Sequence, residues 1–324
     1  FSENDFTAFE KSMMEKVDQL HIPKEVHDRS IAYGEAVAKH IMAWADGDNY
    51  KQSRSFSKFT IDLKNPSRWR TTPPAFMDAI EPHWNQIRPM SLDSAGQYKP
   101  IPHTPFDTTA NSPFMKEAME VYNTGKNLTE EQNLIANYWD CNPYKLNVTG
   151  HAMHATKKIT PGGHWMSITR IAGIKANSDF VTTAYSYAIT SIALFDGFIS
   201  CWDEKFRSNL IRPESVINQY IDEDWQPLLQ TPPFPEYTSG HSVISAASAV
   251  ALASVYGENF AFTDSTEVRF GLPVREFPSF EAACQEAAIS RLYGGIHYQP
   301  AITNGVEQGK KIGNHILNTI RFKK

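Results

Sequence analysis

The sequence predicts an all-α protein folded as a helical bundle. Apolar residues recur at intervals of three and four along most of the chain, which is the period of an amphipathic helix. Strand-like alternation is scarce, and no supersecondary unit repeats along the 324 residues. Hydrophobic residues make up 41% of the chain, enough for a substantial core. No Gly/Ser-rich linker interrupts the sequence, so we expect residues 1–324 to form a single domain.

The N-terminal third combines a helix with a long irregular segment. Residues 24–45 have helical apolar spacing, with Pro23 at the start and Gly47 beyond the end. Residues 49–112 are rich in proline, polar and aromatic residues. We therefore expect them to wrap around the bundle, with one short helix near residues 74–80.

The rest of the chain is predicted to be a succession of helices. Thr129 and Gln132 have the spacing of a capping box, which opens a helix that ends near Asp140. Further helices are expected over residues 163–175, 178–205, 239–256, 280–293 and 302–320. The core-facing stripe of the 178–205 helix is predicted to be Phe180, Ala184, Ala188, Ile192, Phe195 and Ile199.

Charge, hydropathy and cysteine usage exclude several classes of protein. A formal net charge of −5 gives no reason to expect a nucleic-acid or anionic-membrane partner. No apolar run reaches the ~18 residues of a membrane span. Cys141, Cys201 and Cys284 permit one disulfide at most and lack metal-binding spacing, so we expect buried thiols. The chain begins without methionine or an apolar leader, which favours a mature secreted or periplasmic product.

The first candidate for chemistry is Lys205-Phe-Arg-Ser-Asn-Leu-Ile-Arg212-Pro213. Seven residues are about two helical turns, so Lys205 and Arg212 are expected on one helix face, where both cations reach one anion. Pro213 disfavours helical backbone at Arg212, so the helix should end there. By itself such a pair is more often a solvated basic face.

The second candidate is Phe234-Pro-Glu-Tyr-Thr-Ser239-Gly240-His241, which leads directly into an apolar helix. Backbone N–H groups, a hydroxyl and an imidazole then share a helix N-terminus, which attracts oxyanions. The alternative is an ordinary serine cap beside a surface histidine.

The third candidate is Ser290-Arg291-Leu-Tyr-Gly-Gly-Ile-His297. Arg291 lies near a predicted helix C-terminus, and Gly294-Gly295 should turn the chain before His297; the alternative is a helix C-cap with an incidental histidine. Taken together, the three segments supply three cations and several directional donors, which suit a tetrahedral oxyanion. They contribute no ligand set for a hard divalent cation.

These segments resemble the signature shared by vanadium-dependent haloperoxidases and type-2 phosphatidic acid phosphatases. The pattern K-x6-RP, PSGH and SR-x5-H-x3-D appears as Lys205-x6-Arg212-Pro213, Thr238-Ser239-Gly240-His241 and Ser290-Arg291-x5-His297. The resemblance implies a helical bundle of the vanadium haloperoxidase and acid phosphatase type, with an oxyanion pocket in residues 202–297.

Two positions depart from the family pattern. Thr238 replaces a proline, a small loss because Pro235 already stiffens the loop. Ala301 replaces an aspartate that in phosphatases orients and activates the histidine nucleophile. This loss counts against phosphatase turnover more than against anion binding, and we expect a backbone carbonyl to hold His297 instead.

Neighbouring aromatic residues favour the haloperoxidases. Trp202 and Phe234 stand where haloperoxidases keep aromatic residues beside vanadate, although each aromatic alone is more often a core residue. Tyr144 matches the pocket tyrosine of bacterial iodoperoxidases, to which the resemblance is closest. That resemblance implies oxidation of iodide, and less readily bromide, by hydrogen peroxide to hypohalous acid, which halogenates an organic acceptor.

The resemblance also implies a role for each residue. His297 would be the metal ligand of vanadate, which stays V(V) and acts as a Lewis acid. His241 would be the acid–base, and Lys205 would polarise bound peroxide. Because the ligand must be neutral, affinity is expected to fall below roughly pH 6–7. The other residues expected to bind vanadate, or phosphate in its place, are Arg212, Ser239, Gly240 and Arg291.

Two other functions and one other site stay open at this stage. A soluble acid phosphatase would form a phosphohistidine on His297, and a phosphate- or vanadate-binding protein would keep the pocket without turnover. His151, His154 and His164 lie close in sequence but have no evident cysteine or carboxylate partner nearby, which favours hydrogen-bonded histidines over a metal site. Motif spacing does not determine the halide preference or the oligomeric state.

Overall fold

The computed structural model describes residues 2–143, 145–156 and 158–320. The chain divides into two compact units, with the boundary between Lys51 and Gln52. The first unit contains α1 (Glu3–Asp18) and α2 (Lys24–Asp46). α2 confirms the helix expected over residues 24–45, whereas α1 was not predicted. The expectation of one domain for the whole chain stays a prediction, so the units are described in turn.

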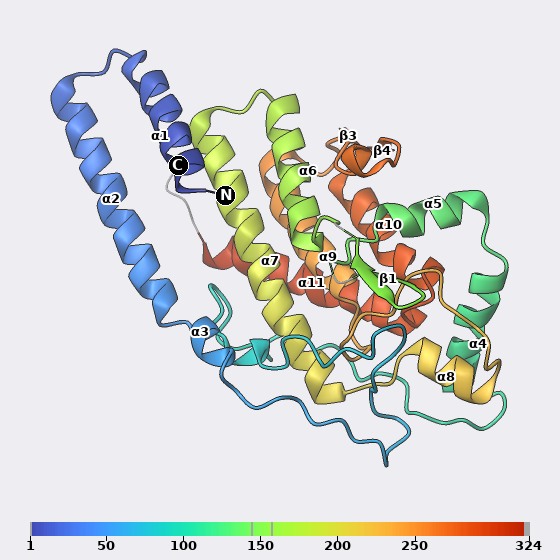
Figure 1. The fold of residues 1–324 in the computed structure, drawn as a ribbon. Helices are drawn as coiled ribbons and strands as arrows, with labels where there is room; N and C mark the ends of the chain where they lie inside the picture. Colours follow the sequence, from blue (N-terminus) through green and yellow to red (C-terminus); the bar gives the residue numbers. More distant parts are fainter. Residues whose placement is uncertain (1, 144, 157, 321–324) are drawn as a thin grey trace. The chain divides into compact units, whose positions relative to one another are not determined.

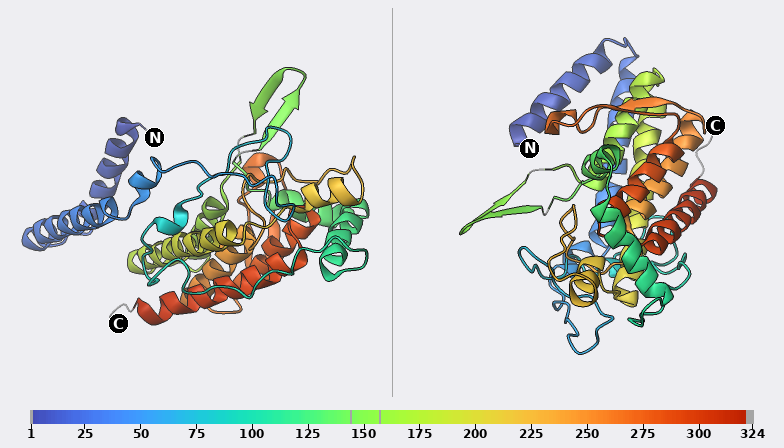
Figure 2. Two further views of the ribbon diagram at one scale, coloured as in Figure 1. Left: turned by 90° about the horizontal axis from the view of Figure 1, so that it is seen from below. Right: turned by 90° about the vertical axis from the view of Figure 1, so that its right-hand side faces the viewer.

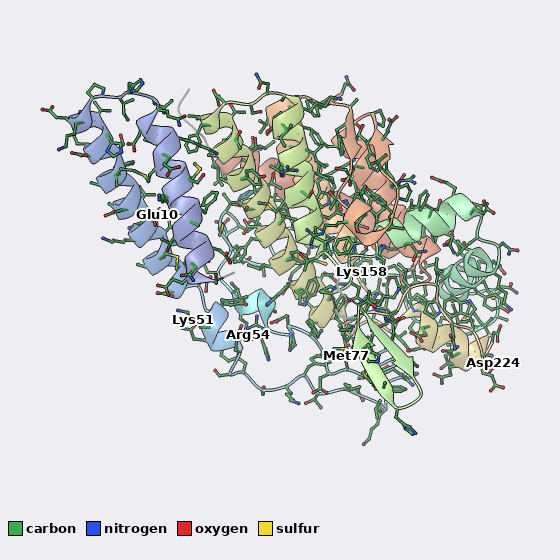
Figure 3. All side chains as sticks on the ribbon, turned by 45° about the horizontal axis from the view of Figure 1, so that its top comes forward. Glu10, Lys51, Arg54, Met77, Lys158 and Asp224 are labelled. Carbon is green, nitrogen blue, oxygen red and sulfur yellow. The ribbon has the colours of Figure 1, made fainter. Side chains whose placement is uncertain are left out.

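The second unit is a bundle built around one central helix, α9 (Gly240–Tyr256), which packs against α6, α7, α10 and α11 (Figure 1). α9 is apolar all round, and most of its side chains are buried, as expected for a helix enclosed by others. Side chains fill the spaces between these helices (Figure 3). The other helices are α3 (Tyr50–Ser53), which straddles the boundary, α4 (Pro113–Lys126), α5 (Glu130–Tyr138), α6 (Pro161–Lys175), α7 (Phe180–Ser208), α8 (Pro213–Tyr220), α10 (Phe280–Tyr293) and α11 (Gln299–Thr319).

The predicted helices over the C-terminal two thirds are confirmed as α5, α6, α7, α9, α10 and α11, and the all-α class is confirmed with them. α4 and α8 were not predicted. Two short antiparallel hairpins also went unpredicted: β1 (Leu146–Thr149) with β2 (Ala152–Ala155), and β3 (Phe262–Asp264) with β4 (Arg275–Phe277). Figure 2 shows the β1–β2 hairpin projecting from the bundle. No described helix is long and apolar enough to cross a membrane.

The proline-rich segment is irregular, as expected, but the helix predicted near residues 74–80 is wrong. That stretch forms turns, because Pro73 and Pro74 lack backbone N–H groups and Phe76 has a φ of 48°. Two short 3-10 turns, η1 (Trp84–Gln86) and η2 (Val268–Phe270), occur elsewhere. Asp196 of α7 anchors the segment, since its carboxylate accepts hydrogen bonds from the N–H groups of residues 90, 91 and 92.

The predicted stripe of α7 is right at its C-terminal end, where Ile199 is buried and Ile192 and Phe195 pack against the core, and wrong at its N-terminal end. Phe180 is 77% exposed, and Ala184 and Ala188 are exposed with it. The buried positions of α7 include small and hydroxyl-bearing residues such as Gly197 and Thr190. They permit close helix packing: a Cβ at Gly197 would lie 3.5 Å from Ile244 of α9. Phe180 and Val181, the large apolar residues at the start of α7, are exposed and take no part in the contact between α7 and α9.

The contact between α9 and α11 is closer still. A Cβ at Gly309 of α11 would lie only 2.1 Å from the carbonyl oxygen of Val243. One turn earlier, a Cβ at Gly305 would lie 2.9 Å from Cβ of Ser242. The Ser239 N–H also donates to the Ala301 carbonyl at 3.1 Å. α11 therefore fixes the first turn of α9, on which the candidate site is built.

Candidate active site

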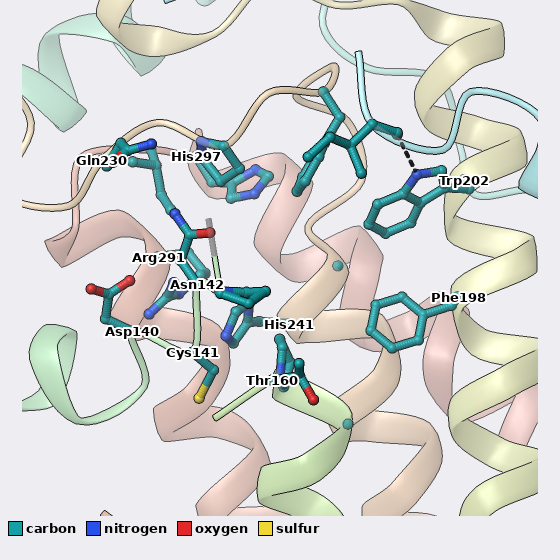
Figure 4. Close-up of a pocket in the computed structure, with 18 of the residues that line it drawn as sticks. Asp140, Cys141, Asn142, Thr160, Phe198, Trp202, Gln230, His241, Arg291 and His297 are labelled. Atoms are coloured by element: carbon teal, nitrogen blue, oxygen red, sulfur yellow. Dashed lines mark hydrogen bonds between the residues drawn. The ribbon is translucent and has the colours of Figure 1, made fainter. Parts of the chain in front are cut away.

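A cavity of about 310 Å³ lies at the N-terminus of α9. Figure 4 shows His241, Arg291 and His297 on one side of it and Phe198 and Trp202 on the other. The predicted site residues that line it are Trp202, Phe234, Gly240, His241, Arg291 and His297. Lys205, Arg212 and Ser239 are completely buried directly behind this lining. Tyr144 lies outside the described residues.

The junction of α7 and α8 brings Lys205 and Arg212 together in a way that the sequence interpretation did not anticipate. The two were expected on one helix face, but α7 ends at Ser208, and Asn209 turns the chain with a φ of 49°. Arg212 then lies in extended backbone just before Pro213, which starts α8. The shared-face prediction is wrong; a reversal of the chain places both cations at the site.

Lys205 is held by backbone oxygens. Its Nζ donates to the carbonyls of Pro235 and Glu236, both at 3.0 Å, and lies 5.1 Å from the centre of the Phe234 ring. Burial disfavours the ammonium form and lowers the pKa of Lys205 to about 7. Lys205 was expected to be a cation from its residue type, and this expectation is wrong in part, because only part of the charge is present near neutral pH.

The two arginines retain their charge and are fixed by carbonyls. Arg212 donates through Nε to Phe234 and through Nη1 to Ile296, both at 2.8 Å, while its buried Nη2 has no hydrogen-bond partner among the described residues. Burial lowers the pKa of Arg212 to about 10, still well above neutral pH. Arg291 donates to the Trp139 carbonyl at 2.8 Å.

The first turn of α9 matches the prediction. Ser239 is the N-cap, and its Oγ accepts from the Ser242 N–H at 3.3 Å. His241 presents a buried Nε2 that has no hydrogen-bond partner among the described residues. Burial, together with Arg291, lowers the pKa of His241 well below its usual value, so the imidazole is neutral.

His297 is held by a carboxylate rather than by the expected backbone carbonyl. Its Nδ1 lies 2.8 Å from Oε1 of Glu236, which also accepts from the Tyr298 N–H at 3.0 Å. A buried carboxylate in this position favours the tautomer with the proton on Nδ1, which leaves the Nε2 lone pair for a ligand. Burial and the nearby Arg212 lower the pKa of His297 well below its usual value. The expected loss of affinity below roughly pH 6–7 therefore moves to lower pH.

Glu236 was missed as a site residue. Burial raises its pKa to about 7 because Arg212 and Lys205 offset the cost of desolvation only in part. The available signal was an acidic residue three positions before Ser239, within a loop already assigned to an oxyanion. Nothing in its spacing from His297, 61 residues away, indicates that the two meet.

An aromatic wall closes the opposite side. The Trp202 ring lies 4.9 Å from Trp84 and from Phe234, and 5.5 Å from Phe198. The Trp202 Nε1 donates to the Ile80 carbonyl at 3.2 Å (Figure 4). Trp84 and Phe198 were not predicted as site residues. The cavity thus joins a cationic, histidine-bearing floor to an apolar wall with few polar atoms.

Comparison with known proteins identifies the family. The family model described as the VCPO second helical-bundle domain matches residues 185–323. A solved structure, the first bacterial vanadium-dependent iodoperoxidase, is 51% identical over 99% of this chain and 76% of that chain, with a TM-score of 0.89. The chain belongs to the vanadium-dependent haloperoxidases. It is accordingly a peroxide-dependent oxidoreductase that acts on a halide, as predicted.

More distant members of the vanadium-dependent haloperoxidases share the fold. A holo-type bacterial vanadium-dependent chloroperoxidase is 16% identical, with a TM-score of 0.67 over 88% of this chain and 71% of that chain. The apo-type enzyme is 17% identical, with a TM-score of 0.62 over 82% and 66% of the two chains. No curated protein matches this haloperoxidase.

Proposed function

We propose that this haloperoxidase binds vanadate in the α9 cavity and oxidises iodide with hydrogen peroxide. The observation that carries the proposal is a buried, neutral His297 whose Nδ1 faces Glu236 while its Nε2 lies beside Arg212. The 51% identity to an iodoperoxidase supports iodide as the halide. Hypoiodous acid formed in the cavity would then react with an organic acceptor.

The residues present fit an oxyanion such as vanadate. Arg212 Nη2 and His241 Nε2 are buried polar atoms without partners among the described residues. An oxyanion would supply the acceptor and charge that Nη2 lacks, and a hydroxyl group on it would donate to the neutral His241 Nε2. Ser239 and the Gly240 N–H lie at the positive end of α9. His297 Nε2 would be the metal ligand, and Lys205 and Arg291 would add charge. Phosphate has the same shape and charge and would compete for the site.

Each residue has a defined task in the reaction. Bound vanadate would supply a Lewis acid that polarises peroxide. Glu236 holds the Nδ1 proton of His297, so that Nε2 stays an acceptor. His241 Nε2 moves protons to and from peroxide, because the imidazole is neutral and its Nε2 has no other partner among the described residues. The aromatic wall around Trp202 excludes water and offers a soft, polarisable surface to iodide.

Glu236 changes the comparison with an acid phosphatase. Ala301 lacks the carboxylate that orients the histidine nucleophile in the phosphatases, but Glu236 supplies a carboxylate to His297 Nδ1. Ala301 therefore does not separate the two functions. The aromatic wall and the relationship to an iodoperoxidase favour halide oxidation.

The test is a triiodide assay with peroxide, run with and without vanadate. We expect vanadate-dependent iodide oxidation that His297→Ala abolishes together with vanadate retention. His151→Ala, an exposed histidine in the β1–β2 hairpin, is the control and should behave like wild type. Full activity in His297→Ala would overturn the assignment, and hydrolysis of a phosphate ester without iodide oxidation would support a phosphatase.

A further inference from the structure

Beside the cavity, on the side of Arg291, lies a second cluster of ligating side chains that has no role in the proposed reaction. Cys141 follows α5, His164 lies in the first turn of α6, and Glu267 precedes η2. Their ligating atoms all lie within 4.8 Å of one another, and all three residues are buried. Because 23 and 103 residues separate them in sequence, only the tertiary fold brings them together.

Three electron-rich atoms converge at the centre of this cluster. His164 Nδ1 lies 3.4 Å from Cys141 Sγ and 3.2 Å from Glu267 Oε1. On its other side, His164 Nε2 lies 2.7 Å from Oδ2 of the completely buried Asp264. A proton on Nε2 that binds Asp264 leaves the Nδ1 lone pair facing the sulfur and the carboxylate. Either a shared proton or a cation must lie between these atoms.

A single proton satisfies this arrangement only in part. A proton on Nδ1 would have to be shared between the Cys141 sulfur and Glu267 Oε1, which has no other partner among the described residues although its side chain is 94% buried. A metal ion would contact all three atoms at once. Two ligand atoms of one tetrahedral zinc ion, bound at about 2.1 and 2.3 Å, lie about 3.4–3.6 Å apart. The observed separations of 3.2 and 3.4 Å are close to these values.

Neighbouring residues hold the side chains of this cluster in place, as at a preorganised metal site. The Trp139 ring stacks on His164 with centroids 4.5 Å apart and an angle of 17°, which fixes the imidazole plane. Asp264 is held in turn by the Thr266 N–H at 2.9 Å. A carboxylate on the far nitrogen of a ligating histidine orients the ring and increases its basicity. Glu267 also borders a surface pocket with Lys158, which offers a route from solvent.

We propose that Cys141, His164 and Glu267 bind a thiophilic divalent cation such as Zn²⁺, with Asp264 orienting His164. At least one further coordination position is left for water. Cys141 also lines the α9 cavity (Figure 4), and the adjacent Trp139 carbonyl holds Arg291. The cation would thus stabilise the segment around Trp139 and Cys141 that holds Arg291 beside the oxyanion, without itself taking part in the peroxide reaction.

The test uses the full chain, stripped with a chelator and titrated with Co²⁺ in the absence of vanadate. We expect equimolar uptake with a thiolate-to-cobalt charge-transfer band and the intense visible bands of a tetrahedral site. Cys141→Ser should lose the charge-transfer band, whereas Cys284→Ser, which removes another buried thiol, should retain it. Asp264→Asn should weaken Co²⁺ binding by about 10–100-fold.

The absence of a thiolate band in the wild-type chain would overturn the proposal and leave a proton on His164 Nδ1. An unchanged band in Cys141→Ser would overturn it as well. If Cys141→Ser fails to fold, two other results still test the proposal. The wild-type chain must show the charge-transfer band, and Glu267→Gln must bind Co²⁺ more weakly than the wild type. Because neither vanadate nor iodide is present, failure here is distinct from failure of the proposed function.

Discussion

Burial sets the protonation of the residues around the cavity. Desolvation lowers the pKa of Lys205 to about 7 and keeps His241 and His297 neutral at neutral pH. The site is therefore less positive than its residue types suggest. An incoming oxyanion would favour the charged form of Lys205, so binding and protonation are coupled at this side chain.

This coupling predicts that vanadate affinity falls as pH rises above about 7. Lys205 is then increasingly neutral in the empty cavity, and binding must take up a proton, with a limiting slope of about tenfold per pH unit. Lys205→Arg should remove this component, because a guanidinium stays protonated. The measurement is the vanadate dissociation constant of both proteins from about pH 6 to 9, a range that spans the pKa of Lys205. Parallel profiles would contradict the assignment to Lys205, since the titration of vanadate itself affects both proteins equally.

Glu236 gives a second prediction for a single residue. Glu236→Gln keeps the shape but removes the negative charge from His297 Nδ1, so we expect vanadate affinity to fall by about 10–100-fold. Equilibrium dialysis of vanadate measures this without turnover. The exposed Glu223→Gln serves as the matched control and should have no effect. Wild-type affinity in Glu236→Gln would show that Glu236 does not orient the ligand.

At the scale of elements, close packing of α9 and α11 positions the oxyanion site. Glycines along α11 allow its backbone to approach α9, and the Ala301 carbonyl receives the Ser239 N–H. Both partners are helices with their own hydrogen bonds, so the approach adds packing without leaving backbone groups unpaired. The position of the α9 N-terminus therefore depends on small residues more than 60 positions away in sequence.

Gly309→Ala tests this packing. The added methyl would clash with the Val243 carbonyl at 2.1 Å, so we expect the free energy of unfolding to fall by about 1–3 kcal/mol or more. Gly173→Ala in α6 is the control. Its Cβ would meet only the Tyr256 hydroxyl at 3.4 Å, and better helix propensity should stabilise by roughly 0.5–1 kcal/mol. Denaturant unfolding measures both; equal effects of the two substitutions would contradict the packing argument.

At the scale of the whole molecule, filling the cavity should stabilise the fold. Arg212, Ser239 and the pair Arg291 and His297 come from three separate segments, so an oxyanion that binds them all is bound only by the folded chain. Free vanadate at a hundred times its dissociation constant should raise the free energy of unfolding by about 2.7 kcal/mol. Thermal unfolding across a vanadate titration checks this. A midpoint that does not move in the wild type, or moves equally in His297→Ala, would contradict it.

Much of the bundle and most of the site could be predicted from local patterns. Helices such as α9 and α10 can be predicted from apolar periodicity and a serine N-cap, because both signals involve residues only a few positions apart. The same locality placed Ser239, Gly240 and His241 at a helix N-terminus. Predictions that required a distant neighbour were less successful. The N-terminal part of the predicted α7 stripe, such as Phe180, is exposed because it was chosen by hydrophobicity, whereas close contact with α9 selects small residues such as Gly197.

Motif order along the chain was therefore sufficient to predict which residues gather at the cavity, because residue type and helix position indicate which side chains and N–H groups can donate to an anion. Only the tertiary structure places Glu236 beside His297 and buries Lys205, which lowers its pKa. It also brings Cys141, His164 and Glu267 together beside the cavity. The physical reason is that protonation and ligand geometry depend on burial and on partners within a few ångströms. Those partners are brought into contact by packing between helices, which no local spacing records.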